Sequence, residues 1–179
     1  MVMVTLGTGV GGGVIMGGRP LIGANGAGGE IGHICVNYFE EKCCGCGKKG
    51  CLEQYASATG IARIAREHLA ADTKDLDNID AKIVFDALKE GDQLAVDVVE
   101  EFGEYLAKGL ADVAVVVDPS LFVIGGGVSK AGEILLTYIE KYYRKRAFFA
   151  NKDTQFAIAS LGNDAGICGA AKLILDSQV

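Results

Sequence analysis

The sequence has little positive charge and no long apolar run, and each absence argues against a class of protein. Basic residues number 17 against 23 acidic ones, which gives a formal net charge of −6. Binding to phosphates needs a basic face, so nucleic acid is not expected as a partner. No apolar run is long enough to span a bilayer, and no signal-peptide pattern is present. We therefore expect no membrane partner and a cytoplasmic location.

A Walker phosphate loop is also missing, although the N-terminal region is rich in glycine. Residues 7–13 read Gly-Thr-Gly-Val-Gly-Gly-Gly, and no Gly-Lys-Ser/Thr follows them. A flexible hairpin connection would explain these glycines. A cradle of backbone amides for phosphate, with Thr8 adding a hydroxyl donor, would also explain them.

The chain has the size of one ordinary domain. It contains 179 residues, and half of them are hydrophobic. This is long enough to bury a substantial core without covalent help, and the composition argues against disorder. We therefore expect residues 1–179 to form a single folding unit.

Six cysteines are present, but their spacing argues against disulfide bonds. Four of them lie within residues 43–51, whereas Cys35 and Cys168 stand apart. Vicinal and one-spaced cysteines are poorly suited to bridges, which need separated and converging backbones. In a reducing cytosol such a cluster is typical of metal binding. Free thiols in a loop are the alternative.

The strongest metal pattern combines one histidine with three of these cysteines. His33 precedes a Cys44-x-Cys46-x4-Cys51 cluster that has glycines between the cysteines. One imidazole and three thiolates make a closed tetrahedral zinc set, which leaves no position for water and predicts a structural ion. Cys43 is a possible substitute ligand, but Cys44 gives the tighter Cys-x-Cys pair.

A glutamate lies just outside each end of this set. Zinc would hold Glu30 and Glu53 on one fixed platform. For Glu53, a carboxylate favoured at a helix N-terminus is an alternative explanation. The small-residue loop 24–29 leads into Glu30, and Asn25 is its only polar side chain. Either a polar ligand approaches this loop closely, or it is an ordinary surface turn.

The hydrophobic pattern predicts three strands followed by helices and strands in alternation. The expected strands cover residues 2–6, 14–16, a short segment from Leu21, 121–124 and 155–160. The expected helices cover residues 55–70, 81–89, 93–117, 131–145 and 164–176. This order predicts an α/β fold with a mixed sheet, one half of a two-lobed ATPase of the actin and hexokinase (ribonuclease H-like) type. The long apolar helix makes a homodimer the expected assembly.

Residues 125–128, Gly-Gly-Gly-Val, lie between an expected buried strand and a helix. An α/β sheet opens to ligands at this kind of junction, at the carboxyl edge of its strands. Glycines there let a flat group or a phosphate come close to the backbone. A tight strand–helix turn is the alternative.

Together, these motifs make the sequence resemble the ROK family (repressors, open reading frames and sugar kinases). The motifs are residues 6–13, Gly-Gly-Glu-Ile-Gly-His at 28–33, Cys-Gly-Cys-Gly-x-x-Gly-Cys-Leu-Glu at 44–53, Ile-Gly-Gly-Gly-Val-Ser at 124–129, and Gly-Asn-Asp-Ala-Gly-Ile-Cys-Gly-Ala-Ala at 162–171. The resemblance covers nearly the whole chain. Within the family, the sequence is most similar to the bacterial glucokinase group.

The resemblance implies ATP-dependent phosphorylation of a hexose, with glucose as the expected sugar and with ATP, Mg²⁺ and structural zinc as cofactors. The implied sugar contacts are Asn25, Glu30, His33 and Glu53. The implied zinc ligands are His33, Cys44, Cys46 and Cys51. The implied nucleotide contacts are Thr8 and Gly9 at the phosphates, and Gly125, Gly126, Gly127 and Val128 at the adenosine.

The family pattern also contains two elements that this sequence lacks. They are an Asp-x-Gly-Gly-Thr phosphate loop and an Asn-Asp pair whose aspartate is the general base. Phosphoryl transfer needs positioning and a group that accepts the hydroxyl proton. We therefore expect no catalytic residue in this chain and no turnover by the chain alone. Residues 1–179 are interpreted as the C-terminal lobe of a two-lobed sugar kinase, without its N-terminal lobe.

Two other functions fit the same residues. One is the sugar-sensing domain of a ROK-type transcriptional repressor. A sensor has no need of a phosphate cradle, so residues 5–13 favour the kinase. The other is a stand-alone zinc-stabilised binding or oligomerisation module. The sugar itself stays open among glucose, N-acetylmannosamine, N-acetylglucosamine and fructose.

Overall fold

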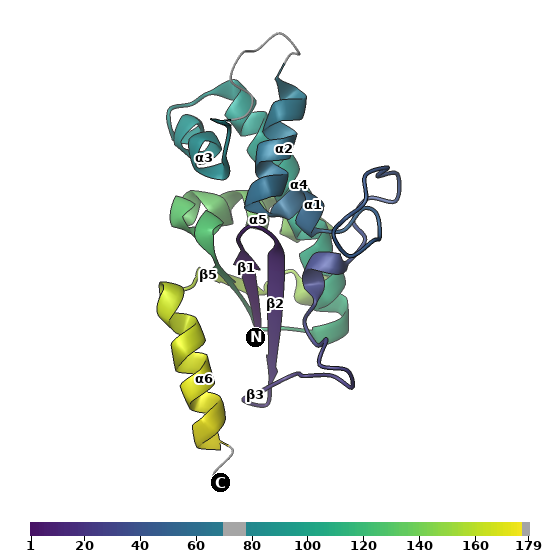
Figure 1. The fold of residues 1–179 in the computed structure, drawn as a ribbon, viewed down its shortest axis with the longest axis vertical. Coiled ribbons are helices and arrows are strands. Elements are labelled where there is room, and N and C mark those ends of the chain that lie inside the picture. Colours follow the sequence, from purple (N-terminus) through teal and green to yellow (C-terminus); the bar gives the residue numbers. More distant parts are fainter. Residues whose placement is uncertain (70–77, 177–179) are drawn as a thin grey trace.

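In the computed structural model, which describes residues 1–69 and 78–176, helices pack around a five-stranded sheet (Figure 1). The strand order is β3-β2-β1-β4-β5. The central strand β1 (Val2–Leu6) pairs antiparallel with β2 (Val10–Met16) and parallel with β4 (Leu121–Gly125). Strand β5 (Gln155–Ile158) continues the sheet in parallel. The predicted α/β fold with a mixed sheet is confirmed.

The helices largely follow the apolar periodicity of the sequence. They are α1 (Glu53–Ala56), α2 (Ala58–His68), α3 (Ala81–Lys89), α4 (Gln93–Val117), α5 (Glu133–Arg146) and α6 (Ala165–Asp176), with 3₁₀ turns η1 (Ile31–His33), η3 (Gly127–Ala131), η4 (Phe149–Asn151) and η5 (Gly162–Asp164). The helix predicted over 55–70 was wrong in one respect. Two helices, α1 and α2, replace it, and they are separated at Ser57, whose backbone is extended. The Ser57 hydroxyl caps α2 by accepting a hydrogen bond from the Gly60 amide. Residue 70 lies outside the described residues.

The glycine-rich run near the N-terminus is mostly strand. Strand β2 begins at Val10, so residues 11–13 pair with β1 and only residues 7–9 form the turn. A Cβ on Gly12 would come within 2.4 Å of the Gly29 carbonyl oxygen and 2.8 Å of Ile31. Because β2 already begins at Val10, the expected start of this strand at residue 14 was wrong. The glycines make room for the chain that crosses the strand.

The third strand also differs from the prediction. Strand β3 (Arg19–Pro20) pairs with Ile15 and Met16, and it ends before Leu21, where the strand was expected to begin. Residues 17 and 18 alone form the turn, and both have positive φ, as two-residue hairpins require. Pro20 is tolerated because β3 is an edge strand.

Helix α4 is the centre of the hydrophobic core. Phe102, Leu106 and Leu110 are fully buried, and the helix packs against α1, α2, α3 and α5. It ends at Asp118, whose left-handed backbone precedes a proline. The apolar pattern behind the homodimer expectation is thus mostly buried within this chain, although Val115 and Val116 are exposed. Within the described part of the chain, none of the helices combines the length and hydropathy that a membrane crossing needs.

Helix α6 differs from the other helices because its apolar side chains face solvent. Ile167, Leu173, Ile174 and Leu175 are between 56% and 72% exposed. Figure 1 shows the helix standing apart from the sheet and its helical layer. A helix that is apolar on most sides is normally buried. Helix α6 therefore leaves apolar side chains exposed that a helix of this pattern normally buries.

The close crossing over β2 can be tested with two glycines of the same strand. Gly12→Ala is expected to lower the free energy of unfolding by about 1–3 kcal/mol, because the new methyl group meets the Gly29 carbonyl. At Gly13 a Cβ would lie 4.0 Å from the Met3 Cβ. Gly13→Ala is thus the matched control, with a change within about 0.5 kcal/mol. Urea unfolding followed by circular dichroism measures both, and equal effects would contradict this packing.

Candidate functional site

Residues 34–53 are here called the knuckle loop. They contain little regular secondary structure and are held by a few backbone contacts. The backbone of Cys35 pairs with that of Cys51, and the backbone of Cys43 with that of Lys49, in isolated antiparallel β-bridges. The Cys44 amide donates to the Lys48 carbonyl at 2.7 Å, and the Gly47 amide donates to the Cys44 carbonyl at 2.9 Å. This tight turn is the knuckle that the cysteine spacing predicted.

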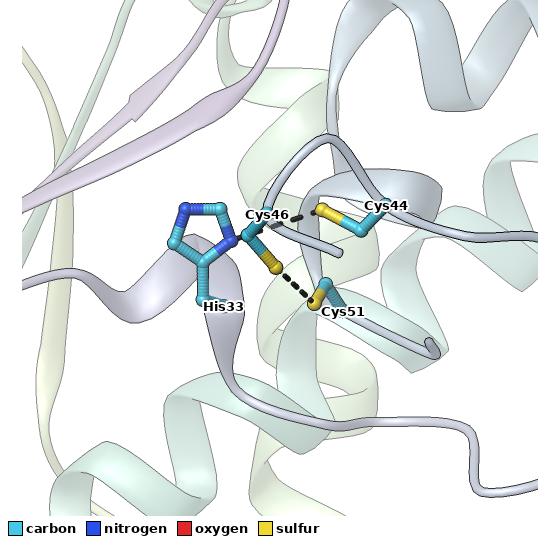
Figure 2. Close-up of side chains that lie close together, drawn as sticks. All are labelled: His33, Cys44, Cys46 and Cys51. Carbon is cyan, nitrogen blue, oxygen red and sulfur yellow. Dashed lines mark hydrogen bonds between the residues drawn. The ribbon is translucent and has the colours of Figure 1, made fainter. Parts of the chain in front are cut away.

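Four potential metal ligands converge between η1 and the knuckle loop (Figure 2). The ligand atoms of His33, Cys44, Cys46 and Cys51 all lie within 4.8 Å of one another. The His33 Nδ1 lies 3.8 Å from the Cys44 Sγ, and the Cys46 Sγ lies 3.6 Å from the Cys51 Sγ. Ligand atoms around a tetrahedral zinc ion would be about 3.6–3.8 Å apart. The donor set therefore fits zinc, and the exposed Cys43 lies outside it.

Burial opposes ionisation of two of these thiols. Desolvation raises the pKa of Cys44 to about 12, and it also raises the pKa of Cys51. A hydrogen bond from the Lys48 backbone lowers the pKa of the exposed Cys46. Metal binding displaces the thiol protons, so a cation would reverse the penalty of burial. The raised pKa values of Cys44 and Cys51 argue against either thiol acting as a reactive nucleophile, which needs a depressed pKa.

The two carboxylates lie on either side of His33. The His33 Nε2 is 3.9 Å from the Glu30 Oε2, and the Nδ1 is 3.9 Å from the Glu53 Oε1. The same Glu53 oxygen accepts a hydrogen bond from the Cys44 thiol at 2.9 Å. Glu53 also begins α1. The helix N-terminus and the cluster thus both account for this glutamate.

The β1–β2 turn lies directly against Glu53. A Cβ on Gly9 would come within 2.7 Å of the Glu53 Oε2, and the Thr8 carbonyl accepts a hydrogen bond from the Thr59 hydroxyl at 2.7 Å. An open hollow of about 370 Å³ lies between the turn, residues 43–45 and the starts of α1 and α2. The glycine turn and one carboxylate therefore share one surface.

A second hollow, of about 310 Å³, lies between η3 and α3. Gly127 and Val128 line it, together with Ala58 of α2, Ala81 and Phe85 of α3. The sequence pattern indicated the glycine side of this hollow. It did not indicate Phe85, because an apolar residue at helical spacing is typical of a core.

The first two glycines of the same motif have a different position. Gly125 and Gly126 are not among the residues that line the hollow. A Cβ on Gly125 would lie 2.5 Å from the Met3 side chain, and one on Gly126 would lie 2.5 Å from the Leu6 carbonyl oxygen. Gly126 also has a φ of 85°. These two glycines let the end of β4 pass close to β1.

Asn25 is the candidate that the structure leaves apart from the cluster. It lies exposed in a turn of the loop before Glu30. Among the described residues, no hydrogen bond or ion pair joins Asn25 to Glu30, His33 or Glu53. The loop itself is held by the Gly28 amide, which donates to the Ile22 carbonyl at 2.9 Å.

The motifs of the sequence match known proteins over nearly its whole length. The family model described as ROK family covers residues 1–177. A glucokinase of Halalkalibacterium halodurans is 46% identical over 187 residues, which cover 99% of this chain and 57% of that protein. The chain therefore spans little more than half the length of the curated relatives that it matches.

Solved structures share the fold. A ROK family glucokinase from Streptomyces griseus, in complex with glucose and AMPPNP, matches with a TM-score of 0.86 and 38% identity, over 96% of this chain and 59% of that one. A ROK family transcriptional regulator, a homologue of the E. coli MLC protein, matches with a TM-score of 0.75 and 32% identity, over 88% and 41%. The fold is thus the predicted lobe of the actin and hexokinase type. With the His–Cys₃ knuckle and the glycine motifs in place, the chain belongs to the ROK family.

Proposed function

We propose that this chain is the sugar-holding lobe of an ATP-dependent hexose kinase that converts glucose to glucose 6-phosphate. The observation that carries the proposal is the contact of Glu53 with the β1–β2 turn at Gly9. A carboxylate suited to sugar hydroxyls lies there beside backbone suited to phosphate. Phosphoryl transfer needs these two ligands next to each other. The glucokinase relatives and the glucose in the Streptomyces griseus complex support the choice of sugar.

In this proposal, Glu30, His33 and Glu53 form the wall that contacts the sugar. Each carboxylate offers paired acceptors for vicinal hydroxyls. The His33 Nδ1 faces Cys44 and would take the metal, which leaves the Nε2 beside Glu30 free for a hydroxyl group. Asn25 is assigned to the rim of the same wall. Zinc held by His33 and the three cysteines would supply structural closure of the loop when bound.

ATP would extend from the second hollow to the β1–β2 turn, with Mg²⁺ neutralising its phosphates. Gly127 and Val128 offer flat backbone there, and Phe85 offers an apolar face for the base. Thr8 and Gly9 offer a hydroxyl and amides for the phosphates. We assign Gly125 and Gly126 to shaping the adenosine pocket, because side chains there would displace β4.

The proposal includes a second, N-terminal lobe outside this chain, and this chain would be the C-terminal lobe of the pair. About two fifths of the Halalkalibacterium halodurans glucokinase lies outside the match, and α6 presents apolar side chains that such a lobe would cover. Glu30 and Glu53 both already face His33, so we assign them to binding. The group that accepts the hydroxyl proton is assigned to the second lobe.

Sugar sensing is the second candidate function, and the likeness to the ROK family regulator favours it. A sensor would use the same sugar wall without turnover. The position of Gly9 against Glu53 supports the kinase, because sensing alone needs no phosphate cradle beside the sugar.

The metal assignment predicts about one zinc ion per purified chain. Cys46→Ala is expected to abolish stoichiometric zinc and to lower the Tm, because the binding free energy of a structural ion contributes to folding. Cys43→Ala is the matched control, since this exposed cysteine lies outside the cluster, and it should keep both zinc and Tm. Elemental analysis and thermal unfolding measure these outcomes. A zinc-free wild type of full stability would contradict the assignment.

The division of roles between two lobes predicts that this chain alone does not turn over ATP and glucose. A chimera that joins it to the part of the Halalkalibacterium halodurans glucokinase outside the match should phosphorylate glucose in a coupled assay. Turnover by residues 1–179 alone would show that the proton acceptor is misassigned. Glucose binding by the chimera without turnover would favour the sensor.

Within that chimera, Glu53→Gln is expected to lower kcat/KM for glucose about 10- to 100-fold, since a charged hydrogen-bond acceptor is lost. Glu41→Gln is the control, because Glu41 is an exposed glutamate of the same loop that does not line the hollow beside Glu53. It should change kcat/KM less than about twofold. Equal losses in the two variants would argue against a sugar contact by Glu53.

A further inference from the structure

A cluster of polar side chains behind the knuckle loop has no part in the proposed reaction. The Tyr55 hydroxyl donates to the Glu40 Oε2 at 2.6 Å and accepts from the Asn37 Nδ2 at 3.0 Å. Arg63 pairs with the same Glu40 oxygen at 3.6 Å, and the Lys42 amide donates to the Glu40 Oε1 at 2.9 Å. Both oxygens of Glu40 thus have partners, and its side chain is only 10% exposed.

Helices hold the other side of this cluster. The buried ring of Tyr55 stacks on Tyr105 of α4, with ring centroids 4.0 Å apart, and the Arg63 guanidinium lies over the Tyr55 ring. Arg63 also donates to the Gln54 carbonyl at 3.0 Å and to Glu67 at 3.0 Å. None of these contacts uses a residue of the His–Cys₃ cluster, so they do not depend on metal.

Gln54 makes a further contact between α1 and the knuckle loop, on both sides of the turn at residues 44–47. Its Oε1 accepts from the Cys51 amide at 3.0 Å, and its Nε2 donates to the Lys42 carbonyl at 3.0 Å. One side chain of α1 therefore ties the chain that enters the cysteine turn to the chain that leaves it.

We propose that Glu40, Tyr55 and Arg63 are positioning residues that clamp the knuckle loop onto α1, α2 and α4 whether or not metal is bound. This proposal rests on the metal site and sugar wall of the proposed function. The clamp keeps the cysteines near one another when metal leaves, and it holds Glu53, on the same short helix as Tyr55, against the β1–β2 turn. A prearranged ligand set pays less ordering entropy on binding. Zinc affinity should therefore depend on side chains that never touch the ion.

The charge of Glu40 strengthens the clamp. The hydrogen bond from Tyr55 is the largest cause of a lowered pKa at Glu40, and it outweighs desolvation. The carboxylate is therefore ionised at neutral pH. Hydrogen bonds to an ionised acceptor are roughly twice as strong as neutral ones.

The first test measures zinc affinity of the 179-residue chain by competition with a chromogenic chelator. Tyr55→Phe removes the hydroxyl and keeps the ring stacking, and Glu40→Gln removes the charge and keeps the shape. Each should raise the Kd for zinc about 10-fold. The double variant should lose little more than Tyr55→Phe alone, because Glu40→Gln weakens the same hydrogen bond that Tyr55→Phe removes.

Two neighbours in the same loop serve as matched controls for these variants. Tyr38 is 80% exposed, and Glu41 is exposed as well. Tyr38→Phe and Glu41→Gln should leave the zinc affinity within about twofold. Equal losses in controls and clamp variants would overturn the proposal.

Cobalt spectra separate positioning from the loss of a ligand. At saturating Co²⁺, Tyr55→Phe and Glu40→Gln should keep the wild-type thiolate charge-transfer intensity, because all four ligands remain. Cys46→Ala should lower it. A lowered intensity in the clamp variants would show that they change the ligand set, and would overturn a purely positioning role.

Hydrogen exchange in chelator-treated protein tests the clamp without metal. The hydrogen-bonded amides of Val36, Cys44, Cys51 and Leu52 should stay protected in the metal-free wild type and exchange at least 10-fold faster in Tyr55→Phe and Glu40→Gln. Loss of protection in the wild type on metal removal would overturn the proposal, as would unchanged exchange in both variants. A wild type that binds no zinc would refute the metal assignment alone, and the exchange comparison would still decide the clamp.

Discussion

The close approach of residues 29–32 and of Glu53 to the β1–β2 hairpin determines where the site residues lie. At three glycines, the backbone or a carboxylate of another segment occupies the space that a side chain would fill. Gly12 faces Gly29, Gly32 faces the Val10 carbonyl, and Gly9 faces Glu53. Strand β2 is fixed by its ladder with β1, whose inward residues are fully buried. The sheet thereby fixes η1, and η1 fixes the imidazole of His33. Larger residues at these positions would separate the imidazole from the strand.

The knuckle loop itself is held from three directions. The glycine face of β2 positions η1, which leads into the loop. The cysteines that converge on His33 position the middle of the loop, and the polar contacts of Tyr55 hold it to the helices. Irregular loops gain little from repeating backbone hydrogen bonds, so their shape depends on such side-chain contacts. Each of the three attachments acts on a different segment. Together they place Glu30 and Glu53 on either side of His33, although no strand or long helix carries them.

Much of this fold could be predicted because its elements have strong local signals. The periodicity of α3 and α4 gave their bounds, and the Cys-x-Cys spacing gave the knuckle. The misjudged elements depend on contacts distant in sequence. Gly11 to Gly13 read as a loop because nothing local reveals that they pair with β1 or that Ile31 of η1 packs on Gly12. The cap at Ser57 occupies one residue, which an apolar pattern cannot resolve. Phe85 could be assigned to a hollow only once α3 was placed beside η3.

The parallel pairing of β1 with β4 has a consequence for the making of the protein. Val2 pairs with Phe122, so the partner of β1 is synthesised 120 residues after it. The β1–β2 hairpin can form soon after it leaves the ribosome, but the other edge of β1 stays open until α4 and β4 have emerged. At typical elongation rates this takes roughly 6–24 s. An apolar strand edge is available for pairing with other chains during that interval. The risk of misassembly is therefore governed by the pace of translation, and the stability of the finished sheet does not reduce it.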